Sequence, residues 1–505
     1  MYPTGFGDCC GITRRGFLLG AAAGVAAAAP LTWLALRGWQ ALHSNGSTFS
    51  GHTKEQAKPP FAMPGPFPGR VVEVRRADAV SRDHRINQQA VNDMIDRGMT
   101  ELTGADDPSE AWKRFFEPGD VVGIKVNPVG RKPKRGEPGR MPHAVGSISS
   151  PEVLLQVVAG LKCAGVRPRD IIVFERYAEE FIDAGYEKVM YERAMDGVRW
   201  CASAARYHGQ QVDIEGFDED RSKFSPELVK HVVGYDPDVF VHMGFASPEH
   251  DPKDDRAVRT HLSVIVSRLV NKLVTIPVLK DHRSAGVTLC LKNLSHGLNN
   301  NVARSHLSGY SHGGIVASGK WPVAGKSNSA VATRHWPLAT SSGPNQCNTF
   351  IPTAVAQPPT RRKATLHILD GLIGVYEGGP GNWNKTWGTW RHRGLLFATD
   401  PVALDHVGWD IINRQRAAEG WAPVEQMGLL AQTRKGALSR HLAGLSARGL
   451  ADALTLSATA AHFQGGLASE SFDRRQPEHI ILASTLGLGR FDPREIEYRQ
   501  VEMTR

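Results

Sequence analysis

The sequence predicts an α/β protein with a mostly parallel sheet flanked by helices, arranged as two lobes around a cleft. Short apolar runs alternate with segments of helical periodicity, and the loops that connect them are short. One helix start, Ser150-Pro151-Glu152, stands between two such runs, as in a βαβ unit. Of the 505 residues, 41% are hydrophobic and 22% are charged, which excludes disordered, collagen-like and polytopic membrane proteins.

The predicted elements follow from local pattern. Apolar runs predict strands at 71–74, 120–126, 171–174, 239–242, 273–276, 287–291, 366–369, 395–398 and 480–483. Helical spacing predicts helices at 92–102, from Ser150 through Leu161, and at 401–418, 423–434 and 437–450. Residues 70–505 form the body, with lobes predicted at 70–270 and 271–505. A long inserted loop at 311–345 is rich in Gly, Ser, Ala and Thr.

The first 44 residues resemble a twin-arginine export signal. Arg14-Arg15 precede Gly16-Phe17-Leu18-Leu19 and an uncharged stretch that runs to Leu36. The resemblance implies the twin-arginine translocation machinery as a partner and a periplasmic or otherwise extracytoplasmic body. Ala27 and Ala29 fit a cleavage site but Pro30 follows them, and an uncleaved stretch is long enough to anchor the protein in a membrane. The alternative is a cytosolic N-terminal helix. Residues 45–69, rich in Pro and Gly, form a linker or a surface strap.

The charge and the cysteines limit the classes of partner and cofactor. The net charge is +9, which permits contact with anions, whereas the basic run 131–135 lacks interleaved aromatic residues and gives no support for nucleic-acid binding. Four of the six cysteines lie in the body, and no Cys-x-x-Cys pair occurs, so we expect no cysteine-ligated iron–sulfur cluster. In an oxidising compartment disulfides among the four could form with three connectivities. The four are Cys163, Cys201, Cys290 and Cys347.

The densest polar segment runs from Lys280 to Asn299. In the predicted strand 287–291 apolar residues alternate, so Lys292 and Asn293 fall at its carboxyl end, where ligands bind in open α/β sheets. An ammonium and an amide there can hold a carboxylate, a phosphate or an oxyanion, and Lys280 belongs to the same segment. The alternative is a surface turn with a solvated lysine and a capping asparagine.

Four histidines lie within about thirty residues: His282, His296, His306 and His312. Their spacing fits no zinc motif. His282 and His306 flank the Lys-Asn turn and are the candidate general bases, because imidazole carries protons near neutral pH. Ordinary surface or capping histidines are the alternative for any one of them.

Acidic side chains follow two further predicted elements. Asp370 ends the strand 366–369, and Glu377 precedes a Gly-Gly-Pro-Gly turn. Asp400 and Pro401 are predicted to be the N-cap and the first residue of a helix, and Asp405 lies further along that helix. Together these four carboxylates supply enough oxygen donors for a hard divalent cation. The alternative is a set of turns and caps with structural roles.

Another strand end carries Lys125 and Asn127, which we expect beside the same cleft. Four of these segments, in order, resemble the family called domain of unknown function 362. They are Gly119–Asn127, Pro277–Leu294, Asp370–Gly381 and Thr399–Asp405, and the resemblance covers roughly residues 115–485. Many relatives carry a ferredoxin-type cysteine cluster, which this sequence lacks, and Ser295-His296-Gly297 departs from the usual pattern. The resemblance implies a fold and a site, not a reaction.

The spacing of His282 and Lys292 is also similar to that in the nickel-pincer lactate racemases, where the histidine moves a proton and the lysine holds the cofactor. That similarity is a single spacing match.

Two functions fit these observations. The first is an enzyme for a small anionic substrate, with Lys292 as a catalytic residue that holds its anionic group and Asn293, Lys280, Lys125 and Asn127 binding the substrate. His282 or His306 would act as base, and Asp370, Glu377, Asp400 and Asp405 would carry a divalent metal or orient the histidines. The second is a non-catalytic solute- or metal-binding protein, tethered by its leader, that uses the same cleft and needs no base.

Overall fold

The computed structural model describes residues 61–129, 148–193, 195–205, 214–217, 220–242, 259–282, 285–302, 305, 347–381, 388–421, 423–426 and 477–504. The predicted leader, the basic run, His306 and the inserted loop lie outside these ranges, as does the helix predicted at 437–450. Within them, no helix combines the length and the apolar character that crossing a membrane requires. The four body cysteines all carry free thiols.

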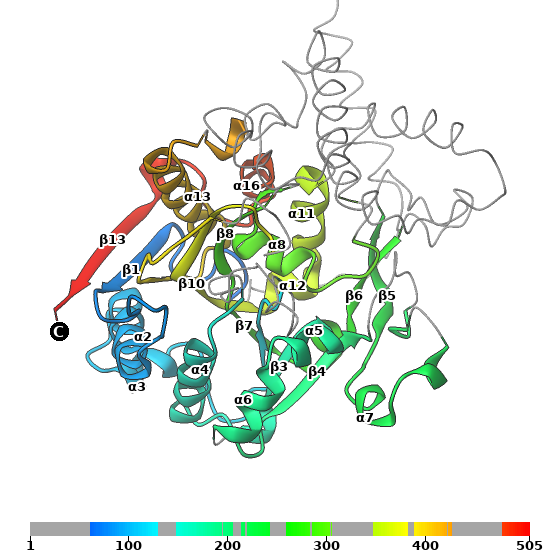
Figure 1. The fold of residues 1–505 in the computed structure, drawn as a ribbon. Coiled ribbons are helices and arrows are strands. Elements are labelled where there is room, and N and C mark those ends of the chain that lie inside the picture. The colour runs from blue at the N-terminus through cyan, green and yellow to red at the C-terminus, as the bar shows by residue number, and fades with distance from the viewer. Residues whose placement is uncertain are drawn as a thin grey trace, which may run out of the picture. The chain divides into compact units, whose positions relative to one another are not determined.

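A mixed sheet of eleven strands runs through the described part of the chain (Figure 1). Its main path has the order β13-β1-β12-β10-β7-β2-β3-β4. These strands are β13 (Glu497–Met503), β1 (Arg70–Arg76), β12 (Gly394–Ala398), β10 (Ala364–Glu377), β7 (Lys272–Thr275), β2 (Val122–Lys125), β3 (Ile171–Tyr177) and β4 (Arg199–Ala204). Three short strands extend it: β8 (Val278–His282), β9 (Gly286–Val287) and β11 (Gly388–Trp390).

The half of the sheet from β10 to β4 is parallel, which confirms the predicted α/β class. β12 is antiparallel to both its neighbours, β1 and β10. The predicted division into lobes at 270/271 does not appear in the sheet, because β7, which follows that boundary, pairs with β2, which precedes it. A separate two-stranded sheet joins β5 (Tyr235–His242) and β6 (Arg259–Ser263).

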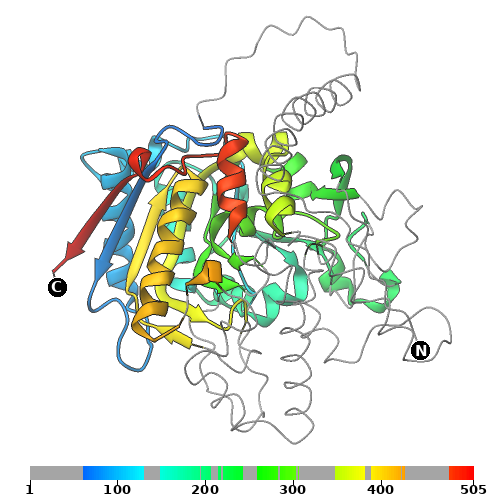
Figure 2. The same ribbon diagram turned by 90° about the horizontal axis from the view of Figure 1, so that it is seen from above.

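Helices cover both faces of the large sheet (Figure 2). One apolar core gathers residues such as Met94, Leu154 and Phe181. They come from α2 (Gln88–Thr103), α3 (Pro108–Lys113), α4 (Pro151–Cys163), α5 (Ala178–Asp183) and α6 (Tyr186–Glu192). The other core gathers Leu291, Ile351 and Leu404. Its helices are α8 (Leu289–Ser295), α11 (Cys347–Val355), α13 (Pro401–Ala418) and α16 (Glu478–Thr485). In the described ranges the large sheet is accompanied by two further short α-helices, α7 (Pro226–Val229) and α12 (Pro358–Lys363).

Two predicted strands are wrong. Residues 287–291 form the end of β9 and then the first turn of α8, because the carboxylate of Asp405 accepts hydrogen bonds from the amides of Cys290 and Leu291 and so caps a helix there. Residues 480–483 belong to α16, since a short apolar run does not distinguish a buried strand from a buried helix turn. Strand β8, which carries Lys280, was not predicted.

Candidate anion-binding site

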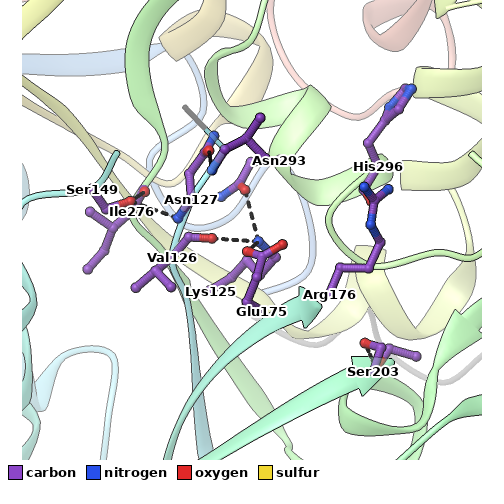
Figure 3. Close-up of polar contacts among 12 residues, drawn as sticks. Lys125, Val126, Asn127, Ser149, Glu175, Arg176, Ser203, Ile276, Asn293 and His296 are labelled. Atoms are coloured by element: carbon purple, nitrogen blue, oxygen red, sulfur yellow. Dashed lines mark hydrogen bonds and ion pairs between the residues drawn. The ribbon is translucent and has the colours of Figure 1, made fainter. Parts of the chain in front are cut away.

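The ammonium of Lys125 marks the carboxyl end of β2, where several polar elements meet (Figure 3). Its Nζ donates to the Val126 carbonyl at 2.5 Å, to the Asn293 Oδ1 at 3.2 Å and to the carboxylate of Glu175, at the carboxyl end of the neighbouring strand β3. Lys125 is 1% exposed. Burial, the largest influence, lowers the pKa of Lys125 and raises that of Glu175, while the attraction between the two opposes both shifts.

Lys280 lies on β8 and is fully buried. Its Nζ donates to the carbonyl oxygens of Val129 (2.5 Å) and Pro380 (3.1 Å) and to the Asn127 Oδ1 (3.3 Å). Burial and then the charge of Lys292 lower the pKa of Lys280 to about 7. Lys280 therefore joins three segments and lies close enough to Lys292 to feel its charge.

The ammonium of Lys292 differs from the other two lysines. It is 8% exposed, and its Nζ makes no hydrogen bond or ion pair with any part of the chain that the structure describes. Burial, the largest influence, lowers the pKa of Lys292, Cys347 opposes the shift and the charge of Arg176 adds to it, so that the pKa is about 8. An unpartnered buried cation is costly, so proteins keep one mainly where a ligand or a reaction requires it.

Neighbouring polar groups also have unused hydrogen-bonding capacity. The Nδ2 of Asn293 and the Nε of Arg176 are both buried without a hydrogen-bond partner. Arg176 uses its Nη1 to bind the His296 carbonyl at 2.8 Å, and Figure 3 shows its side chain extending toward that residue. The unused groups of Lys292, Asn293 and Arg176 are all donors, so the complementary ligand is rich in acceptors, as a carboxylate or phosphate is.

The charges of the site favour an anion. The cluster contains four cationic side chains: Lys125, Arg176, Lys280 and Lys292. It also contains three carboxylates, which raise the pKa of Lys280 or form an ion pair with Lys125. The carboxylates are Glu175, Glu180 and Asp281. Asp281 is itself held by the amides of Gly378 (3.1 Å) and Gly379 (2.7 Å). The cationic side chains of this cluster thus outnumber its carboxylates by one.

Gly297 leaves room for the Lys125 ammonium. A Cβ at this position would lie 2.3 Å from the Asn293 carbonyl oxygen and 2.9 Å from the Lys125 Nζ. Any larger residue would therefore displace the turn after α8 or the lysine.

The four predicted metal ligands have separate structural roles. Asp370 accepts from the Ser150 amide at 2.7 Å, and Glu377 pairs with Arg416 at 2.7 Å. Asp405 caps α8, as described above. Asp400 is the N-cap of α13, as predicted, and also accepts from the amides of Gly69 and Arg490. The described ranges contain no group of three or more His, Cys, Asp or Glu side chains placed to hold a metal ion. The structure thus does not bring these four carboxylates together as a ligand set.

Of the four predicted histidines, His282 and His296 lie in the described residues and have different hydrogen-bond partners. His282 ends β8, beside Lys280, and its Nδ1 accepts from the Ala285 amide at 3.2 Å. His296 bonds the hydroxyls of Ser295 (3.1 Å) and Ser305 (2.8 Å). His306 and His312 lie outside the described residues.

Glu175 and Arg176 are site residues that the sequence reasoning missed. They lie just before the last residue of β3, the strand next to β2. The rule that located Lys125, polar residues at the carboxyl end of a parallel strand, applies equally to them. The predicted strand 171–174 stops directly before them.

Residues 239–410 match the family described as Domain of unknown function (DUF362). The match is shorter than the predicted 115–485. It includes Lys280, Lys292 and Asn293, whereas Lys125, Glu175 and Arg176 precede it. No curated protein matches the chain. The matched residues 239–410 supply two of the lysines of the site, so this part of the chain is similar to the domain of unknown function 362 family.

Proposed function

We propose that the protein is an enzyme that binds a small anionic substrate in the buried cluster around Lys125, Lys280 and Lys292. The observation that supports this most is the Lys292 side chain, which is 8% exposed and whose ammonium makes no hydrogen bond within the described ranges, together with two buried donors that lack acceptors, on Asn293 and Arg176. A carboxylate or phosphate would satisfy all three groups at once. Lys125 and Lys280 have partners of their own and would hold the site in shape while adding positive charge.

In this proposal Lys292 contacts the reacting group of the substrate. Its pKa of about 8 leaves both protonation states populated near neutral pH, as proton transfer requires. Arg176 and Asn293 would bind the oxyanion. This assigns to Lys292 the proton-transfer role that the sequence suggested for His282 or His306; the Nδ1 of His282 already accepts a hydrogen bond from the Ala285 amide.

A non-catalytic binding protein is the second candidate, because unused donors alone are sufficient to hold an anion. The two candidates differ in what they need from Lys292. A binding protein needs only its charge, whereas the enzyme also needs its proton to exchange.

The substitution Lys292→Met tests the anion site itself. Methionine is apolar and similar in length to lysine, so the substitution removes an unpartnered charge without shortening the side chain much. We therefore expect an unchanged or higher melting temperature. Binding of inorganic phosphate, L-lactate and oxalate, measured by calorimetry, should be lost for any of these that the wild-type protein binds. The matched control is Lys363→Met, since burial also lowers the pKa of Lys363 but its Nζ donates to the carbonyls of Val266 and Ser267 away from the site. An unfolded Lys292→Met protein would make Lys292 structural, and wild-type protein that binds none of the probes and no copurifying anion would contradict the proposal.

Lys292→Arg separates the enzyme from the binding protein. Arginine keeps the charge but does not release its proton near neutral pH. An anion that copurifies with the protein is identified by mass spectrometry and incubated with the protein in deuterium oxide. Deuterium incorporation or turnover that is present in the wild type and absent in Lys292→Arg supports the enzyme. Equal binding with no exchange or turnover in either protein supports the non-catalytic alternative.

A further inference from the structure

A hollow with a volume of about 290 Å³ lies among β1, β13, α13 and the segment after β11. It is lined by Arg75, Arg391, Arg414, Trp390, His392 and Glu73, together with neighbouring residues. None of these residues belongs to the lysine cluster. The volume is near the lower end of the range for small-molecule sites, about 300 Å³.

A histidine–glutamate pair lies at its wall. The carboxylate of Glu73, which is fully buried, accepts a hydrogen bond from the His392 Nε2 at 2.6 Å, one from the Gln500 Nε2 at 2.8 Å, and one from the Tyr498 hydroxyl. Burial alone would raise the pKa of Glu73, but the hydrogen bonds from these three groups, that from His392 first, lower it to about 2. Glu73 is therefore an ionised acceptor at neutral pH.

This pairing fixes the orientation of the imidazole. Because an ionised carboxylate only accepts, the Nε2 of His392 carries the hydrogen, and in the neutral ring the Nδ1 has the free lone pair. That Nδ1 makes no hydrogen bond within the described ranges. It is the ring nitrogen that a ligand in the hollow can use.

Three guanidinium groups give the hollow its charge. Arg414 is exposed on α13 and makes no hydrogen bond or ion pair with the described residues. Arg75 pairs with Glu502 at 3.2 Å and lies 4.0 Å from Glu73, yet its Nε is buried without a hydrogen-bond partner. Arg391 donates to the Ser81 carbonyl at 3.1 Å. Arginine suits the planar recognition of carboxylate and phosphate.

We propose that this hollow is a second ligand site, for a small molecule that carries both an oxyanion and a hydroxyl group. Arg75 and Arg414 bind the oxyanion, the His392 Nδ1 accepts a hydrogen bond from the hydroxyl, and the indole of Trp390 provides a flat apolar wall for the carbon skeleton. Sugar phosphates and hydroxy acids belong to this class. The proposal does not depend on the function assigned to the lysine cluster.

The test uses the full chain carrying Lys292→Met, so that the lysine cluster does not contribute, with the wild type measured in parallel. Calorimetry measures binding of glycerol 3-phosphate, glycerate and n-propyl phosphate, the last of which lacks hydroxyl groups. We expect Arg414→Gln to weaken binding of the phosphates at least tenfold. The control is Arg97→Gln on α2, whose guanidinium pairs with Glu101 outside the hollow, and it should change nothing.

His392→Gln tests the hydroxyl contact, because the glutamine amide can still donate to Glu73. Glycerol 3-phosphate should then bind several-fold more weakly, while propyl phosphate is unaffected. Equal weakening of both probes would show that His392 only supports the fold. Absence of binding in the Lys292→Met protein, or binding that Arg414→Gln leaves unchanged, would overturn the proposal. If glycerate binds and the phosphates do not, the site takes a hydroxy acid.

Discussion

The Nζ of Lys125 donates to the Oδ1 of Asn293 at 3.2 Å, across 168 residues of sequence. This contact orients the Asn293 amide, because the oxygen faces Lys125 and the Nδ2 is left buried without an acceptor. The bond therefore determines which end of the amide a ligand meets.

Asn293→Asp should weaken anion binding while it preserves the fold. The carboxylate keeps the acceptor for Lys125 but replaces the free donor with an oxygen and adds a negative charge next to Lys292. We expect affinity for the anion that copurifies with the wild type to fall at least tenfold, a change of about 1.4 kcal/mol or more, measured by calorimetry. Asn92→Asp, on the half-buried surface of α2, serves as the control. Unchanged affinity in Asn293→Asp would place the ligand elsewhere.

Anion affinity should depend on pH in a defined direction. The lysine pKa values of about 7 for Lys280 and about 8 for Lys292 mean that both side chains are charged below pH 7 and lose charge as the pH rises. Affinity should be highest below pH 7 and fall above it, approaching tenfold per pH unit above pH 8 for each required charge. In Lys292→Arg the fall should be shallower. Affinity that increases with pH would contradict the assigned site.

The free energy of unfolding of the unliganded protein should change with pH in the direction opposite to the anion affinity. The pKa of Lys292 is about 8 in the folded chain, against an ordinary value of 10.5. Between these values the unfolded chain binds more protons, so the contribution of Lys292 to the free energy of unfolding rises with pH. Below pH 8 its buried charge destabilises the fold fully.

Lys292→Met removes this contribution. Relative to wild type, the variant should be stabilised more at pH 7 than at pH 10, as measured by urea unfolding at both pH values. Lys188→Met, at an exposed position on α6, should show the same difference from wild type at each pH. A Lys292→Met protein that is less stable at pH 7 than at pH 10, relative to wild type, would show that the ammonium has a partner.

Asp405 should stabilise the protein because it caps α8, and not because it binds a metal ion. Its carboxylate receives the amides of Cys290 at 2.7 Å and Leu291 at 2.8 Å. Asp405→Ala leaves both amides buried without an acceptor, so the free energy of unfolding should fall by about 2–4 kcal/mol, and anion binding should weaken because α8 carries Lys292 and Asn293.

Asp410→Asn, at an exposed position on the same helix, is the control and should have little effect. A chelator separates the structural role of Asp405 from a role as metal ligand. If ethylenediaminetetraacetic acid lowers the melting temperature of the wild type as much as Asp405→Ala does, Asp405 holds a metal.

The sequence by itself determined the α/β class and most of the strand and helix positions, because apolar periodicity, Ser150-Pro151 and Asp400-Pro401 are local signals that report burial and capping directly. It also located Lys125, since polar residues at the end of an apolar strand gather at one edge of a parallel sheet. Only the tertiary structure decided that residues 289–295 are helical, because their cap, Asp405, comes from 115 residues away. The same holds for the four carboxylates, which the sequence grouped as metal ligands. Whether a buried charge is bonded or free depends on partners distant in sequence, and this separates Lys280, with three acceptors, from Lys292, with none in the described structure.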